Sequence, residues 1–152
     1  MAVPMKTTVP HLLTEKLGGL LFDYPHNIQF RQQDMICNSE AAEQYDFILC
    51  LSVTKWIHLL HGDEGIRVLF RKIYSLLKPG GRLILEPQTW KSYHKRKFTS
   101  AKTEANYGRI QLRPKDFPLC LIDEIGFKSS EFIRVCQTSS KGFRRPIYVI
   151  QK

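Results

Sequence analysis

Residues 45–86 constrain the fold more than any other part of the chain. The apolar run 45–51 (YDFILCL) predicts a short parallel strand that is buried on both faces. Asp63 is a candidate N-cap for a following helix, which residues 78–81 (KPGG) should end, because proline cannot continue a helix. Residues 82–86 (RLILE) predict a second strand, so the segment should form a right-handed parallel crossover. The helix between the strands has one apolar stripe: Ile66, Leu69, Phe70, Ile73, Leu76 and Leu77.

The remaining segments predict that this crossover belongs to a single α/β domain. Residues 28–30 are a candidate short strand. Pro114 should start a helix that continues to Gly126, since proline suits the first turn and glycine the end. The β-rich runs 131–137 and 147–150 predict an antiparallel pair at the end of the sheet. We therefore expect an irregular leader over residues 1–23 and one domain over residues 24–152.

The charge of the chain favours an anionic partner. Lys and Arg number 23 and Asp and Glu 14, which gives a formal net charge of +9. The basic residues cluster in segments 91–102 and 141–145, so we expect a phosphate-bearing partner, although solvated lysines are the alternative explanation. No apolar run approaches the roughly 20 residues that a membrane span needs, and no secretory signal is recognisable. The four cysteines are scattered, and Cys50 and Cys136 fall inside apolar runs, which favours reduced structural thiols of a cytosolic or nuclear protein over a metal site or disulfides.

Polar and aromatic residues follow each predicted strand. Residues 33–35 (QDM), 52–58 (SVTKWIH) and 87–90 (PQTW) occupy these positions. Because ligands bind beyond the carboxyl ends of the strands in open α/β sheets, we expect the three segments to line one pocket.

Several of these segments together resemble the Bicoid-interacting-protein-3 domain family, from about Tyr24 to Ile150. The resemblance implies a Rossmann-like class I methyltransferase sheet, mostly parallel with an antiparallel C-terminal hairpin. It also implies S-adenosylmethionine as cofactor and methyl transfer to the 5′-terminal phosphate of a small non-coding RNA, with ribonucleoprotein proteins as further partners. The branch that acts on 7SK RNA is the most similar, which implies a nuclear location, with the cytoplasm as the alternative. The motifs are LCLSVTKWIHL, GDEG, LLKPGGRLILEPQTW, SYHKRK, RIQL and SKGFRRP.

The resemblance assigns roles to individual residues near the predicted strand ends. Asp34 and Met35 fall where the family contacts adenine, although the family usually has Asn and Tyr there. Leu51 and Ser52 fall at cofactor-contacting positions. The loop that borders cofactor and phosphate also contains Lys55, Trp56 and His58.

The side-chain chemistry of Lys55, Trp56 and His58 predicts a different role for each residue. Lys55 is the expected phosphate anchor, and Trp56 is the expected wall against which the first base stacks. His58 could be a hydrogen-bond partner or a structural histidine.

Two basic segments with interleaved aromatic residues are candidate RNA contacts. A solvated surface is the alternative for both, and Trp90 could be either a core cover or an RNA platform. The candidates are Lys91, Tyr93, Lys95, Arg96 and Lys97 in the first segment and Lys141, Phe143, Arg144 and Arg145 in the second.

The sequence lacks the donor half of the expected cofactor site. Neither a glycine-rich turn after a first strand nor an acid after a second is recognisable, and Gly18-Gly19 follows no strand. The first two strands of the family fold are therefore expected to be missing, as in a shortened isoform, a partial gene model or a degenerate copy. Their absence would leave the strand at 45–51 with an open edge. An inactive module that binds RNA or a protein is the alternative function.

Overall fold

The computed structural model describes residues 25, 27–37, 45–133, 140 and 144–152. The chain divides into two compact units, Met1–Asp34 and Met35–Lys152. In the first unit, residues 28–34 form no strand, and Ile28 and Phe30 are exposed. The predicted strand at 28–30 is therefore wrong, because its few apolar side chains are not buried and no described strand completes its backbone hydrogen bonds. The predicted leader, residues 1–23, lies outside the described residues.

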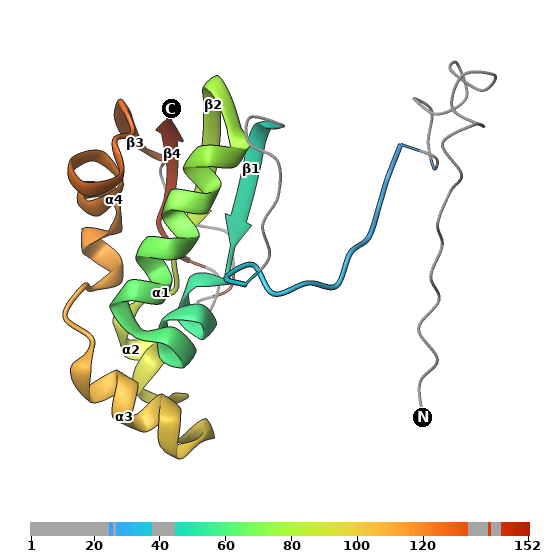
Figure 1. Ribbon diagram of the computed structural model, residues 1–152. Helices are drawn as coiled ribbons and strands as arrows, with labels where there is room; N and C mark the ends of the chain where they lie inside the picture. The colour runs from blue at the N-terminus through green and yellow to red at the C-terminus, as the bar shows by residue number, and fades with distance from the viewer. Residues whose placement is uncertain (1–24, 26, 38–44, 134–139, 141–143) are drawn as a thin grey trace. The chain divides into compact units, whose positions relative to one another are not determined.

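The second unit contains a mixed four-stranded sheet (Figure 1). The strands lie in the order β1-β2-β4-β3, with β1 parallel to β2 and β4 antiparallel to both of its neighbours. This topology confirms the parallel pair and the antiparallel pair at the end of the sheet, while residues 134–137 lie outside the described residues. The strands are β1 (Tyr45–Leu51), β2 (Leu77–Glu86), β3 (Ser129–Ile133) and β4 (Ile147–Gln151).

Strand β1 forms an edge of this sheet. Cys50 is buried beneath the helices, but the side chains of Phe47 and Leu49 are 59% and 64% exposed. The prediction that β1 is buried on both faces is therefore wrong. Within the described part of the chain β1 has β2 as its only neighbour.

Helix α1 (Thr54–Leu76) connects the two parallel strands. It is interrupted at Gly62, whose φ of 67° and ψ of −165° lie outside the helical region. The prediction of Asp63 as the helix N-cap is wrong: the helix begins at Thr54, and Asp63 only follows the interruption. The predicted end is confirmed, since the helix stops at Leu76 and residues 78–81 already belong to β2. No helix within the described ranges is long and apolar enough to cross a membrane.

Short helical segments connect β2 to β3. The predicted helix between Pro114 and Gly126 is confirmed in extent, and it consists of a 3-10 turn, an α-turn and a π-turn that ends at Gly126 with φ 101°. Helix α3 was not predicted because it has no apolar stripe; a capping box between Ser100 and Thr103 starts it. The segments are α2 (Trp90–His94), η3 (Lys97–Thr99), α3 (Ala101–Arg109), η4 (Pro114–Asp116), α4 (Phe117–Cys120) and η5 (Leu121–Ile125).

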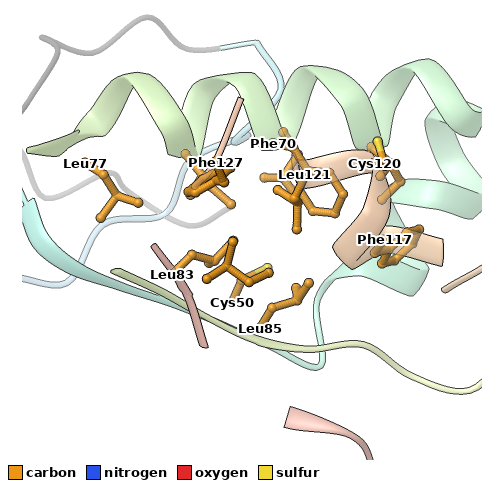
Figure 2. Packing of buried hydrophobic residues seen from close by; sticks show 13 residues of the cluster. Cys50, Phe70, Leu77, Leu83, Leu85, Phe117, Cys120, Leu121 and Phe127 are labelled. Atoms are coloured by element: carbon orange, nitrogen blue, oxygen red, sulfur yellow. The ribbon is translucent and has the colours of Figure 1, made fainter. Parts of the chain in front are cut away.

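The hydrophobic core lies between the sheet and the helices α1, α4 and η5. Leu83 and Leu85 of β2 face Phe70 of α1 and Leu121 of η5 (Figure 2). Burial of a side chain of this size stabilises the fold by about 1.5–3 kcal/mol. The whole predicted apolar stripe, from Ile66 to Leu77, is buried in this core.

The buried cysteines belong to this core. Burial raises the pKa of Cys50 to about 12 and that of Cys120 to about 11, so both thiols stay protonated at neutral pH. The prediction that Cys50 is a core side chain is confirmed, and Cys136 lies outside the described residues. Across the described ranges, no cluster of three or more His, Cys, Asp or Glu side chains could hold a metal ion.

Candidate functional site

The carboxyl ends of β1 and β2 are joined by an ionic and hydrogen-bonded cluster. Ser52 follows β1 with a φ of 60°, which is uncommon for a residue other than glycine. Its hydroxyl donates to Glu86 Oε1 at 3.0 Å and accepts from the guanidinium of Arg145. Arg145 also donates to Glu86 Oε1 at 2.9 Å. The carboxylate at the end of β2 is thus compensated by a cation from the segment before β4.

Gln88 fixes the start of α1 from the neighbouring strand end. Its side chain is buried, and Oε1 accepts from the Lys55 backbone N–H at 3.2 Å and the Thr54 hydroxyl at 3.3 Å. Its Nε2 donates to the Ser52 carbonyl. Val53, the N-cap residue, makes no side-chain cap, so Gln88 satisfies a helix-terminal N–H that would otherwise lack a partner. Lys55 is thereby held at a defined position beside β2.

The Lys55 side chain lies in a cationic environment. Its side chain is largely buried, and Nζ lies 4.8 Å from the ring centroid of Trp56, which is 40% exposed. Burial lowers the pKa of Lys55, and the charges of Arg96 and Arg145 lower it further. Among the described residues, no hydrogen bond or ion pair links the Lys55 ammonium to an acceptor. Since the nearby Glu86 is paired with Arg145, this group of three cations is suited to an external anion.

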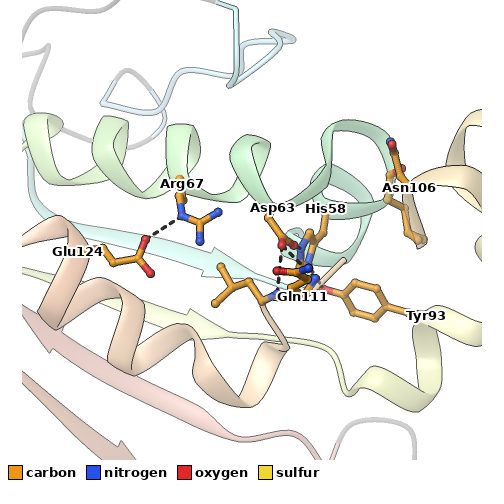
Figure 3. Close-up of polar contacts among 9 residues, drawn as sticks. His58, Asp63, Arg67, Tyr93, Asn106, Gln111 and Glu124 are labelled. Carbon is orange, nitrogen blue, oxygen red and sulfur yellow. Dashed lines mark hydrogen bonds and ion pairs between the residues drawn. The ribbon is translucent and has the colours of Figure 1, made fainter. Parts of the chain in front are cut away.

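His58, on the first part of α1, is buried in a polar network. Its Nε2 lies 2.8 Å from Asp63 Oδ1, and its Nδ1 lies 3.3 Å from the Tyr93 hydroxyl (Figure 3). Asp63 Oδ2 accepts from the backbone N–H groups of Gln111 and Leu112 at 2.9 and 3.1 Å. His58 and Tyr93 have no exposed surface. Of the two alternatives for His58, these contacts favour the structural histidine, because they link α1 to two other segments. Tyr93 is likewise buried and is not an exposed RNA contact.

This network predicts that acid destabilises the fold. Burial lowers the pKa of His58, and this outweighs the opposing effect of Asp63. The unfolded chain takes up the histidine proton near pH 6.5 while the folded chain resists it, so the free energy of unfolding should fall as the pH drops below this value. The slope should approach about 1.4 kcal/mol per pH unit. Urea denaturation between pH 5 and 8 measures it.

Two histidine variants provide the control. His58→Gln should flatten the pH dependence between pH 5 and 7, whereas substitution of the exposed His61 by Gln should retain the wild-type slope. Equal slopes in His58→Gln and the wild type would contradict the prediction. Asp63 affects stability in a lower pH range. Burial raises its pKa, but hydrogen bonds from His58 and two backbone N–H groups outweigh burial and hold the pKa below its ordinary value of 3.8. The stability that Asp63 contributes is therefore lost only as the pH falls below 3.8.

The other predicted RNA contacts differ in exposure. Lys91, Lys95, Arg96 and Arg144 are exposed, whereas Lys97 is half-buried, with Nζ 4.7 Å from the Phe98 centroid. Arg145 does not face outward from a loop but joins the cluster with Glu86. Lys141 and Phe143 lie outside the described residues.

The predicted cofactor contacts are brought together only in part. Leu51, which is exposed, adjoins Ser52 at the end of β1, but Asp34 belongs to the first unit and is not placed relative to this site. Met35 packs half-buried against the hydrophobic core. The roles of these four residues stay predictions.

Three functional features were not predicted from the sequence. The linking role of Asp63, the capping role of Gln88 and the contact of Arg113 with the Trp90 ring all depend on segments that are distant in the sequence. Local signals existed only for Gln88, which stands two residues after a predicted strand, and for Arg113, which precedes the helix-starting Pro114.

Comparison with known proteins assigns this arrangement to a family. Residues 45–152 match the family model of Bicoid-interacting protein 3 (Bin3). The chain belongs to the Bin3 family. It is 43% identical over 135 residues to the human 7SK snRNA methylphosphate capping enzyme, covering 85% of this chain and 20% of that enzyme. It is 39% identical over 149 residues to the Drosophila melanogaster U6 snRNA methylphosphate capping enzyme Amus, covering 95% of this chain and 49% of Amus.

Solved structures support the fold of this Bin3 chain. A SAM-dependent methyltransferase from Archaeoglobus fulgidus aligns with a TM-score of 0.54 at 12% identity, covering 93% of this chain and 80% of that one. The CurJ carbon methyltransferase aligns with a TM-score of 0.53 at 18% identity, covering 93% and 39%. The predicted Rossmann-like methyltransferase fold is confirmed, as is the predicted family. The chain spans less than half the length of the human and Drosophila relatives.

The described residues fit one side of an S-adenosylmethionine site. Leu51 and Ser52 end β1, where a ligand of this fold binds. The described glycines with positive φ are Gly62, Gly80 and Gly126, and none of them follows a strand end of the sheet. Within the described ranges of the second unit, no carboxylate other than the paired Glu86 stands at the carboxyl ends of β1 and β2. The contacts that would hold ribose and methionine are therefore not found among these residues.

Proposed function

We propose that this chain acts as an S-adenosylmethionine-dependent RNA methyltransferase that modifies the 5′-terminal phosphate of a small RNA. The observation that carries this proposal is the Lys55 ammonium, held beside Arg96 and Arg145 without an anionic partner among the described residues. The names of the capping enzymes among the relatives support the same substrate class.

Methylation of a phosphate depends on position more than on proton transfer. A phosphate oxygen is already anionic at neutral pH, so the reaction needs no strong base; it needs that oxygen held in line with the methyl donor. Lys55 supplies a point charge for the phosphate, and Gln88 fixes the backbone that carries Lys55. Trp56 offers an exposed aromatic face to the first base. The hydrogen bond between His58 and Tyr93 attaches the first part of α1 to α2.

S-adenosylmethionine supplies an electrophilic methyl group when it is bound. In this chain Leu51 and Ser52 would border it, and Asp34 and Met35 are proposed to contact its adenine. Glu86 would not repel the phosphate strongly, because Arg145 compensates its charge.

The names of the relatives support a more specific substrate and a location for the chain. Two of them are named for small nuclear RNAs, 7SK and U6, so we infer a small nuclear RNA as substrate and the nucleus as location. The exposed Lys91, Lys95, Arg96 and Arg144 would contact the RNA backbone, and their charge favours such binding at low salt.

A pair of RNA oligonucleotides that differ only at the 5′ end tests the proposal. We expect methyl transfer from radiolabelled S-adenosylmethionine to the 5′-phosphorylated RNA and none to the 5′-hydroxyl RNA. Calorimetry should detect S-adenosylmethionine binding. Failure to bind the cofactor at millimolar concentration, together with equal affinity for both RNAs, would refute the proposal and leave an RNA-binding module.

A further inference from the structure

A cavity of about 400 Å³ lies next to the end of β2, on the segments that follow β2 and precede α4 and β4. Its apolar walls include Pro87, Pro114, Pro146 and Tyr148. Arg113 and Lys115 bring two cations to the lining, and no lining residue is acidic. The volume is within the range of small-molecule sites. Apolar walls combined with an excess of positive charge favour a ligand that has both an apolar part and negative charge.

Two residues that line the cavity, Trp90 and Arg113, belong to a cluster of planar groups that also includes Tyr107. The rings of Tyr107 and Trp90 are nearly parallel, with an interplanar angle of 6° and centroids 4.6 Å apart. The Arg113 guanidinium carbon lies 3.7 Å from the Trp90 centroid. Two groups of this size cannot share one face of an indole, so Tyr107 and Arg113 must cover opposite faces. Trp90 is therefore a core cover rather than an open RNA platform, and the Arg113 guanidinium covers its second face.

The Arg113 guanidinium has unused hydrogen-bonding capacity. Its Nη1 atom is buried and has no hydrogen-bond partner among the described residues. A buried donor without an acceptor is unfavourable, and a charged one more so. A ligand oxygen would remove this penalty, and a planar base would extend the stack, because guanidinium planes stack on nucleobases.

The cavity is connected to the candidate site through Gln88. Gln88 lines the cavity, and its carboxamide also holds the backbone of Lys55. We propose that the cavity binds one nucleotide of the RNA near its 5′ end, with the base against the Arg113 plane and a phosphate near Arg113 and Lys115. This inference rests on the proposed function, since it takes the RNA to be anchored at Lys55.

Anisotropy with 3′-fluorescein-labelled RNA tests the inference on the full chain. Arg113→Met keeps an unbranched apolar stem but removes the guanidinium, and with it the charge, the donors and the contact with Trp90. We expect its dissociation constant to rise about tenfold, the effect of one charge-assisted hydrogen bond. The rise should be equal for 5′-phosphorylated and 5′-hydroxyl RNA. Substitution of the exposed Arg109 by Met is the matched control and should leave the affinity within about twofold.

A series of RNAs with a single abasic nucleotide identifies the base that enters the cavity. In the wild type, one position near the 5′ end should weaken binding, and the same change should have no further effect in Arg113→Met. If Arg113→Met does not fold, Lys115→Ala and the wild-type abasic series still decide the matter. Normal RNA affinity of a folded Arg113→Met, or no sensitive abasic position, would overturn the inference.

Two further outcomes separate related explanations. Binding of GMP or AMP that RNA does not displace would assign the cavity to a free nucleotide and overturn the RNA assignment. Loss of affinity in Arg113→Met without any wild-type preference for a 5′ phosphate would refute the proposed function and retain the cavity as an RNA site.

Discussion

Lys55→Ala is expected to lower methyl transfer to a 5′-phosphorylated RNA by roughly 10- to 100-fold, the effect of losing a charged hydrogen bond to phosphate. The ammonium is held by a backbone that Gln88 fixes, and no described acid neutralises it. The variant should fold normally, because removal of a cation beside Arg96 and Arg145 relieves repulsion instead of leaving a charge unpaired. Initial rates with saturating S-adenosylmethionine measure the effect.

A second readout distinguishes anchoring from a general loss of positive charge. Lys55→Ala should abolish the preference for 5′-phosphorylated over 5′-hydroxyl RNA. Substitution of the exposed Lys102 by alanine removes the same charge elsewhere and should keep that preference. If both variants kept the preference and the wild-type rate, Lys55 would not be the phosphate anchor.

The central part of the fold could be predicted because its signals are local. The apolar run of β1, the stripe of α1 and the KPGG sequence each determine a segment by their own spacing. Strand β1 has the predicted bounds and α1 ends where predicted, although α1 and β2 both begin earlier than predicted. The exposure of β1 could not be predicted in the same way, because a continuous apolar run does not reveal which neighbours are present. The predicted strand at residues 28–30 was wrong for a related reason. A strand needs a neighbouring strand, and a short sequence pattern does not reveal whether one is present.

The candidate site was predicted in its position but only partly in its roles. Motif spacing correctly placed Ser52 directly after β1, whereas Lys55, expected in a loop, lies in the first turn of α1. His58 was ambiguous because the deciding contacts, Asp63 across the interruption at Gly62 and Tyr93 on α2, are created by tertiary structure. The same holds for Gln88, whose three partners lie more than thirty positions earlier in the chain.

Among substitutions of buried polar residues at the site, Gln88→Leu should lower the free energy of unfolding most. Leucine fills a similar volume but leaves the Lys55 N–H and the Ser52 carbonyl without their buried partner, and removes an acceptor from the Thr54 hydroxyl. Leaving such groups unsatisfied costs about 1–3 kcal/mol each, so the free energy of unfolding should fall by roughly 3 kcal/mol after partial relaxation. Urea denaturation at pH 7 measures this change.

The matched control for this variant is substitution of Gln111 by leucine. The Gln111 side chain is exposed, and only its backbone N–H contacts Asp63, so stability should change by no more than about 0.5 kcal/mol. Gln88→Leu should also slow methyl transfer under conditions where it remains folded, because the first turn of α1, which carries Lys55, would no longer be held against β2. Unchanged stability with a reduced rate would mean that Gln88 acts on the RNA through the cavity instead of through the start of α1. If Gln88 holds the start of α1 and also lines the RNA site in the cavity, Gln88→Leu should lower both stability and rate, and the Gln111 variant should lower neither.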